Sequence, residues 1–161
     1  MASLTTELSN KVNKWLSPIF DKSIHEQINA LISEDPKTLE DSFYKDLEFG
    51  TGGMRGIMGV GTNRMNKYTI GKNTQGLSNY LHKIFSGKPI KVAIAYDCRH
   101  NSKSFAKIVA DVFSANNIKV YVFEDLRPTP ELSFAVKHLN CHCGIVPVSY
   151  THLTLPTIYS V

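Results

Sequence analysis

The stretch IKVAIAY at Ile90–Tyr96 is a short apolar run rich in β-branched residues. A run of this kind is typical of a strand that is buried on both faces of a sheet. The polar turn after it contains Asn101 and Ser102, either of which can cap a helix. That helix is expected to end at Asn116-Asn117, before a second apolar run at Ile118–Phe123. Strand, helix and strand together predict a β-α-β unit.

Further elements are expected on both sides of this unit. Thr129 as cap, with Pro130 in the first helical turn, predicts another helix, and Gly144-Ile145-Val146 begins a third strand. Asn66 is expected to cap an earlier helix that stops near Gly87. Alternating strands and helices indicate an α/β fold with a mainly parallel sheet in three layers and right-handed crossovers. The expected buried stripe of the earlier helix is Ile70, Leu77, Tyr80, Leu81, Ile84 and Phe85.

Two amphipathic helices are expected at the N-terminus. Apolar residues recur at helical spacing over residues 4–19 and 24–32, and the second helix is expected to close before Pro36. The predicted organisation is therefore an N-terminal helical segment, residues 1–40, followed by an α/β domain, residues 41–146.

The composition is that of a globular domain in water. The 161 residues are 42% hydrophobic and 20% charged, which suits one ordinary core. The net charge of +4 is spread along the chain without a basic run or interleaved aromatic residues, which argues against nucleic-acid binding. The sequence shows no signal-peptide pattern and no apolar segment of membrane length, so a cytoplasmic protein without a membrane partner is expected.

The cysteines do not suggest a disulfide framework or a metal site. Cys98, Cys141 and Cys143 are an odd set, so reduced thiols are expected. His138 and His142 lie beside the last two, but the paired Cys-x-x-Cys spacing of structural zinc sites is absent. The alternative, a helix end running into a buried strand, is preferred, and no metal ligand is predicted in the chain.

The strongest functional signal lies between Gly50 and Arg55. This segment holds three glycines, the Thr51 hydroxyl and one guanidinium. Glycines let backbone amides approach an anion closely, and a guanidinium offers forked donors that match two phosphate oxygens. The spacing is neither that of a Walker loop nor that of a dinucleotide fingerprint. A glycine-rich turn that only connects two elements is the alternative interpretation.

The wider sequence resembles the α-D-phosphohexomutases, the phosphoglucomutase and phosphomannomutase family. Leu47–Asn66 is similar to the opening signature of that family. Tyr96–Ser102 is similar to its Tyr-Asp-x-Arg-x-x-Ser segment, and Arg127–Pro130 to its Thr-Pro turn. The three similarities occur in the order in which the family has them.

The resemblance implies an incomplete first α/β/α domain of a multidomain mutase. It implies phosphoryl transfer between the 1- and 6-positions of a hexose phosphate through a phosphoserine, with Mg²⁺ and a glucose 1,6-bisphosphate-type activator. Arg55 would be the catalytic arginine beside the transferring phosphate. Thr51, Gly52 and Gly53 would shape the phosphate-binding loop, and Arg99 would support it less directly. The Mg²⁺ would be held by the phosphoserine and an Asp-rich loop of a later domain.

Asp97 and Arg99 are expected at the carboxyl edge of the sheet, where α/β proteins place ligand sites. Direct contact with a ligand is one interpretation. The other is that the two side chains bind backbone groups and each other within a tight turn. Both interpretations stay open at this point.

The expected phosphoserine motif, Thr-Ala-Ser-His-Asn-Pro, does not follow the third strand. Residues 147–161 instead depart from the family, and Val148–Leu153 looks like the translation of a transposase adapter used in sequencing libraries. We therefore expect a non-native tail from about Pro147, since proline also removes a ladder donor from a strand. Ser149 and His152 match neither the family motif nor a catalytic pair oriented by a third residue.

The chain is accordingly expected to be inactive by itself, with remaining mutase domains missing. A sheet cut at its third strand is expected to leave an edge and an apolar face uncovered. Two other functions use the same residues differently. A phosphate or phosphosugar binding module would use Thr51–Arg55 without chemistry, and a protein-interaction module would use the helices before Pro36.

Overall fold

The computed structural model describes residues 6–50, 53–148 and 155–160, with side chains placed up to residue 147. No helix in these ranges is both long and apolar enough to cross a bilayer. The helices are α1 Thr6–Trp15, α2 Lys22–Glu34, α3 Pro36–Phe43, α4 Lys67–Ile84, α5 Ser102–Ala115 and α6 Thr129–His138, and the strands are β1 Phe49–Gly50, β2 Gly53–Met54, β3 Lys91–Ile94, β4 Lys119–Val122, β5 Cys143–Val148 and β6 Leu155–Ser160.

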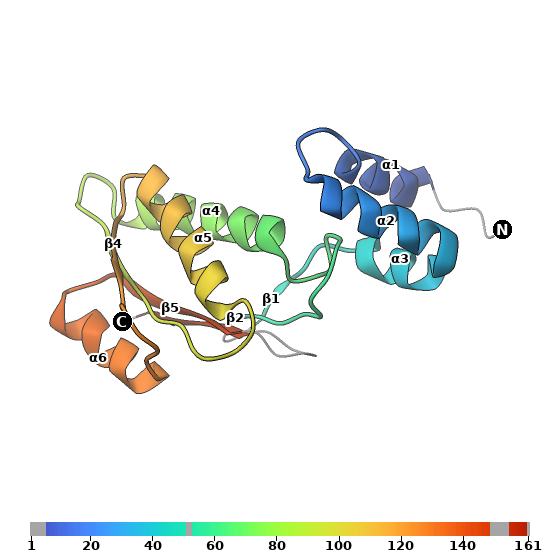
Figure 1. Ribbon diagram of the computed structural model, residues 1–161. Coiled ribbons are helices and arrows are strands. Elements are labelled where there is room, and N and C mark those ends of the chain that lie inside the picture. Colours follow the sequence, from blue (N-terminus) through green and yellow to red (C-terminus); the bar gives the residue numbers. More distant parts are fainter. Residues whose placement is uncertain (1–5, 51–52, 149–154, 161) are drawn as a thin grey trace.

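The main sheet has the strand order β4-β3-β5-β6. The first three strands are parallel, with Val92 opposite Val120 on one side and Cys143 on the other. The last strand, β6, runs antiparallel to β5. Helices α4 and α5 cover one face of the sheet and α6 covers the other (Figure 1). The predicted three-layer α/β/α fold with a mainly parallel sheet is confirmed.

Strand β3 is buried on both faces, as its sequence predicts. Val92 and Ile94 belong to the core cluster beneath α4 and α5. Ala93 belongs instead to the cluster beneath α6, together with Leu132. Successive side chains of a strand point to opposite faces, so an uninterrupted apolar run fills both layers.

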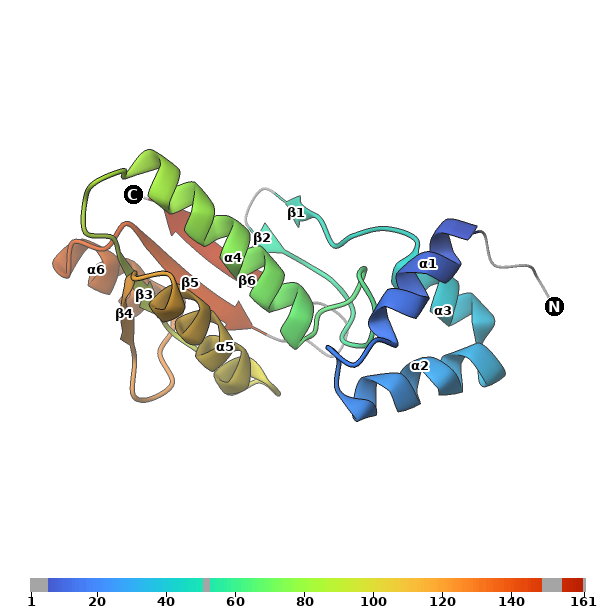
Figure 2. The ribbon, with the colours of Figure 1, turned by 90° about the horizontal axis from the view of Figure 1, so that it is seen from above.

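The N-terminal part contains three helices, and the prediction of two is wrong. Helix α3 begins at Pro36, where a helix stop was expected. Proline suits the first turn because its missing N–H would have no partner there. The Asp35 carboxylate caps this helix by accepting the Thr38 N–H at 3.1 Å. The three helices gather at one end of the molecule, away from the sheet (Figure 2). A domain boundary after residue 40 would cut α3.

The helical part has its own core and is tied to α4. Trp15 lies edge-on to Phe43 and Tyr68, with ring centroids 5.5 and 5.7 Å apart. The Tyr68 hydroxyl accepts the Asp21 N–H at 3.0 Å. The Lys67 ammonium bonds the Asp21 carboxylate, and this bond is the main reason that the pKa of Asp21 is lowered. The helical part therefore packs on the start of α4.

The predictions for helix α4 are partly confirmed and partly wrong. Its predicted cap is confirmed, because the Asn66 side chain accepts the N–H groups of Tyr68 and Thr69. Two expected core residues are wrong: Tyr80 and Ile84 are 58% and 52% exposed. The sheet covers a stripe narrower than the apolar face of the helix, and both residues lie on its margin. Helix α6 also differs, because Thr129 is its first residue and Pro128 is its cap.

The edge of the third strand is covered, contrary to the expected exposed edge. All six residues of β5 pair with β6, from Cys143↔Ser160 to Val148↔Leu155. Pairing of β3 with β5 ends at Ile145, so Pro147 lies beyond that ladder and interrupts no bond to β3. A proline is tolerated at such a position.

Candidate functional site

Arg55 directly follows β2 of the β1–β2 hairpin, and its side chain is exposed. It lines a cavity of about 520 Å³ together with Lys45, Glu48 and Asn63. Within the described part of the chain, its guanidinium has no hydrogen bond or ion pair. Two cations and one carboxylate give the cavity a net positive lining, and its size is that of a small-ligand pocket. An anionic ligand of phosphosugar size is the chemistry that this lining favours.

The glycines of the hairpin make this arrangement possible. Gly50 pairs with Gly53, and a Cβ at Gly50 would lie 3.3 Å from the Gly53 carbonyl oxygen. Gly53 has a φ of +134°, which side-chain-bearing residues rarely adopt. Gly50 and Gly53 therefore allow the two strands to pair closely just before Arg55. Thr51 and Gly52, the other expected loop residues, lie outside the described residues.

Arg99 is in a different position from Arg55. Its Nε lies 3.3 Å from the Asp97 Oδ2, and its N–H donates to the Asp97 Oδ1 at 3.1 Å. The Asp97 N–H in turn donates to the buried Ser102 hydroxyl at 3.0 Å. The turn thus contains the mutual contacts of the second interpretation. Among the described residues that line the Arg55 cavity, Arg99 is absent.

The sequence does not mark Lys45 and Asn63 as residues of the site, although both line the Arg55 cavity. Lys45 lies two residues beyond α3, and no motif marks it. Asn63 falls inside the family signature, but nothing in the pattern says that it faces the same cavity as Arg55. Both are brought to Arg55 by the fold, because the Thr62 hydroxyl donates to the Lys45 carbonyl at 2.6 Å. That bond holds the two segments side by side.

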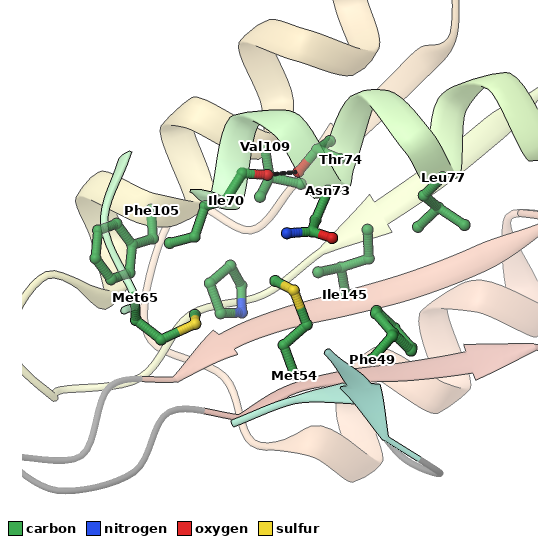
Figure 3. Close-up of a pocket in the computed structure, with 11 residues that line it drawn as sticks. Phe49, Met54, Met65, Ile70, Asn73, Thr74, Leu77, Phe105, Val109 and Ile145 are labelled. Carbon is green, nitrogen blue, oxygen red and sulfur yellow. Dashed lines mark hydrogen bonds between the residues drawn. The ribbon is translucent and has the colours of Figure 1, made fainter. Parts of the chain in front are cut away.

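Apolar side chains around a small cavity beneath the hairpin join the hairpin to the rest of the domain. The cavity measures about 40 Å³, and Met54 of the hairpin faces Ile145 of β5 across it (Figure 3). Met65, Asn73 and Phe105 close it from the loop, α4 and α5. Its small volume and apolar lining suit packing rather than a charged ligand. Packing of Met54 therefore fixes the backbone directly before Arg55.

The described residues contain no cluster that fits a magnesium site. In the described ranges, no three His, Cys, Asp or Glu side chains gather in a way that could hold a metal ion. Cys141 and Cys143 are buried, and burial raises the pKa of Cys143 to about 12. Such a thiol stays protonated at neutral pH and is therefore a poor nucleophile. We derive no step through a metal from these residues.

Comparison with known proteins gives consistent matches. Residues 46–149 match the family domain described as phosphoglucomutase/phosphomannomutase, alpha/beta/alpha domain I. A phosphoglucomutase of Staphylococcus epidermidis is 36% identical over 134 residues, and the human phosphopentomutase is 37% identical over 147. These alignments cover 83% and 86% of this chain, but only 24% of each relative.

A solved structure from Thermus thermophilus, described as a phosphomannomutase, has the same fold. The TM-score is 0.64 at 22% identity, over 72% of this chain and 26% of that chain. The chain thus spans about a quarter of the length of each of these three proteins.

Proposed function

The chain belongs to the phosphoglucomutase/phosphomannomutase family, and we propose that its α/β domain, the part of the chain that follows α3, holds a phosphoryl group in the Arg55 cavity. The observation that carries this proposal is an exposed arginine with no partner among the described residues, presented by a glycine hairpin at a cavity of about 520 Å³. A guanidinium that has no partner among the described residues, in a cavity that Lys45 also lines, can bind an anion without first leaving any of those residues.

The proposed chemistry is the family's transfer of phosphate between the 1- and 6-positions of a hexose phosphate. This reaction depends on charge neutralisation and positioning more than on covalent help from side chains. Arg55 would donate to two oxygens of the transferring phosphoryl group, and Lys45 would add positive potential. Gly53, with Thr51 and Gly52, would bring the backbone close to the anion. Arg99 would support this phosphate-binding loop less directly. Mg²⁺ and a glucose 1,6-bisphosphate-type activator remain part of the proposal for the whole enzyme.

A pentose phosphate is the second candidate substrate. The human phosphopentomutase and the S. epidermidis phosphoglucomutase have nearly equal identity to this chain, 37% and 36%. Domain I similarity therefore does not distinguish the two sugars. Hexose phosphate is preferred because the family domain that this chain matches is described by two hexose enzymes, phosphoglucomutase and phosphomannomutase.

We also propose that residues 147–161 are a non-native tail. The adapter-like sequence from Val148 supports this, whereas the family match extends to residue 149 and so overlaps the tail by a few residues. The genomic read across the codons for Val146 to Val148 tests it. A native frame that continues into Ser-His-Asn-Pro would support the proposal, and a read that encodes the present tail would contradict it.

A graft tests the function directly. Residues 47–66 of this chain would replace the matching segment of the S. epidermidis phosphoglucomutase, and glucose 1-phosphate turnover would be measured with Mg²⁺ and bisphosphate. The graft is expected to keep activity within about tenfold of the parent. Arg55→Ala in the graft is expected to lower kcat about 100-fold or more, as removal of a transition-state donor does.

The chain alone provides the control for that experiment. Its 161 residues contain no Thr-Ala-Ser-His-Asn-Pro motif, so no turnover above the buffer blank is expected. An inactive graft, or clear turnover by the chain alone, would contradict the proposed function.

A further inference from the structure

The loop between the hairpin and α4 is fastened to the C-terminus of α3. The last carbonyl groups of a helix have no partner within the helix. Here the Asn63 N–H donates to the Ser42 carbonyl at 2.9 Å, and the Asn63 side-chain amide donates to the Asp41 carbonyl at 3.0 Å. A Cβ at Gly61 would lie 2.3 Å from the same Ser42 oxygen. The loop backbone therefore lies directly on the end of the helix.

Arg64 is the charged member of this junction. Its side chain is only 7% exposed. It bonds the Asp41 carboxylate and donates to the Asp41 and Asn63 carbonyls at 3.3 and 3.1 Å. A cation at a helix C-terminus is also favoured by the helix dipole. A buried guanidinium with three acceptors fixes its neighbours firmly, because moving any one of them away would leave a buried N–H without a hydrogen-bond partner.

A chain of short contacts leads from Arg64 to Arg55. Met65, the next residue, donates its N–H to the Ile57 carbonyl at 2.8 Å and accepts the Gly59 N–H at 3.2 Å. A Cβ at Gly56 would lie 3.5 Å from the Met65 side chain. The chain before Arg55 is thus held by Met54, which packs in the apolar cavity. The chain after Arg55 is held by its contacts with Met65, beside the junction.

Asn66 holds the same loop from its other end. Its side-chain amide donates to the carbonyl groups of Gly59, Gly61 and Arg64 at 2.9, 3.0 and 3.3 Å while its oxygen caps α4. One side chain therefore links the loop to the helix that follows. Arg64 links it to the helix that precedes.

We propose that Arg64 is a positioning residue that fastens the loop to α3 and thereby sets where Arg55 points. The N-terminal helical part would then act as the mount of the phosphate site, although it precedes the residues that match the family domain. This inference rests on the proposed function for its choice of ligand. It concerns Arg64, which is not among the described residues that line the Arg55 cavity.

The test compares Arg64→Ala, Arg64→Lys and Asp41→Asn with the parent chain. Amide hydrogen exchange would be measured at Met65 and Gly59, and at Ala95, whose N–H bonds Ile145 in the sheet. Inorganic phosphate affinity would be measured at a temperature where each variant is folded. Arg64→Ala is expected to speed exchange at Met65 and Gly59 about tenfold while Ala95 is unchanged, and to weaken phosphate binding about three- to tenfold.

Conservative variants separate positioning from general stability. Arg64→Lys keeps the charge but not the forked donors, so it is expected to show a smaller effect than Arg64→Ala. Asp41→Asn keeps the backbone carbonyl of residue 41 as an acceptor and is also expected to show a smaller effect than Arg64→Ala. Lys107→Ala removes a cation from the exposed Lys107–Asp111 pair on α5 and controls for net charge. Equal acceleration at all three amides, or no local change at Met65 and Gly59, would overturn the proposal. Absence of phosphate binding by the parent chain would count against the proposed function instead, and the exchange data would still decide this inference.

Discussion

Replacing Arg55 with alanine is expected to weaken binding of glucose 6-phosphate by about 10- to 100-fold. The reason is the loss of charge-assisted hydrogen bonds from a fork that matches two phosphate oxygens, which are worth about 1.5–3 kcal/mol. The side chain is exposed and has no partner among the described residues, so folding stability is expected to change by about 0.5 kcal/mol at most. Isothermal titration calorimetry measures the affinity, and thermal denaturation measures the stability.

Arg127 supplies the matched control for Arg55. It is a half-buried arginine whose side chain is 40% exposed and pairs with Glu131 on α6, and it does not line the Arg55 cavity. Arg127→Ala removes the same charge and is expected to leave the affinity within about twofold, since exposed charges interact weakly over distance in salt. Equal losses in the two variants would show that binding responds to net charge and not to the Arg55 cavity.

Replacing Gly61 with alanine is expected to lower the free energy of unfolding by about 3 kcal/mol or more. Gly61 has a φ of +122°, which costs an alanine about 1–3 kcal/mol. The new methyl group would also lie 2.3 Å from the Ser42 carbonyl oxygen and 2.8 Å from its Cβ. Relief requires the loop to move off the end of α3, because backbone atoms cannot turn aside as a flexible side chain can. Urea denaturation measures the change.

Gly76 is the control for that substitution. It lies on the exposed side of α4 with no atom within 4 Å of an added Cβ. Gly76→Ala is expected to stabilise the protein by up to about 1 kcal/mol, because alanine favours the helical state. A Gly61→Ala protein as stable as the parent would contradict the close approach of loop and helix.

The sequence predicts the sheet because its signals are local. The apolar run of β3 and the cap Asn66 each lie within a few residues of the structure that they specify. Signals of this kind do not reach across the chain. Helix α3 was missed because Pro36 suits both a helix stop and a first turn, and the choice depends on the Asp35 cap beside it.

The composition of the site was only half predictable for the same reason. Arg55 stands in a glycine-rich motif, so the pattern singles it out. Lys45 and Asn63 reach the same cavity through hydrogen bonds between residues 17 to 22 apart in the sequence. No local signal in the sequence marks Arg64 as buried, yet the end of α3 buries it. For Tyr80 and Ile84 the prediction is wrong in the opposite sense, because they were expected in the core and are exposed. Periodicity predicts which face of a helix is apolar but not how wide the surface is that covers this face.

The most direct measurement is an NMR titration of the ¹⁵N-labelled chain with inorganic phosphate. The account predicts saturable shifts confined to the amides of residues 50–57 and 63, together with the Arg55 Nε signal, and their absence in Arg55→Ala. Shifts spread over exposed lysines such as Lys107, or no saturable shift at the hairpin, would contradict the claim that this cavity was shaped for a phosphoryl group.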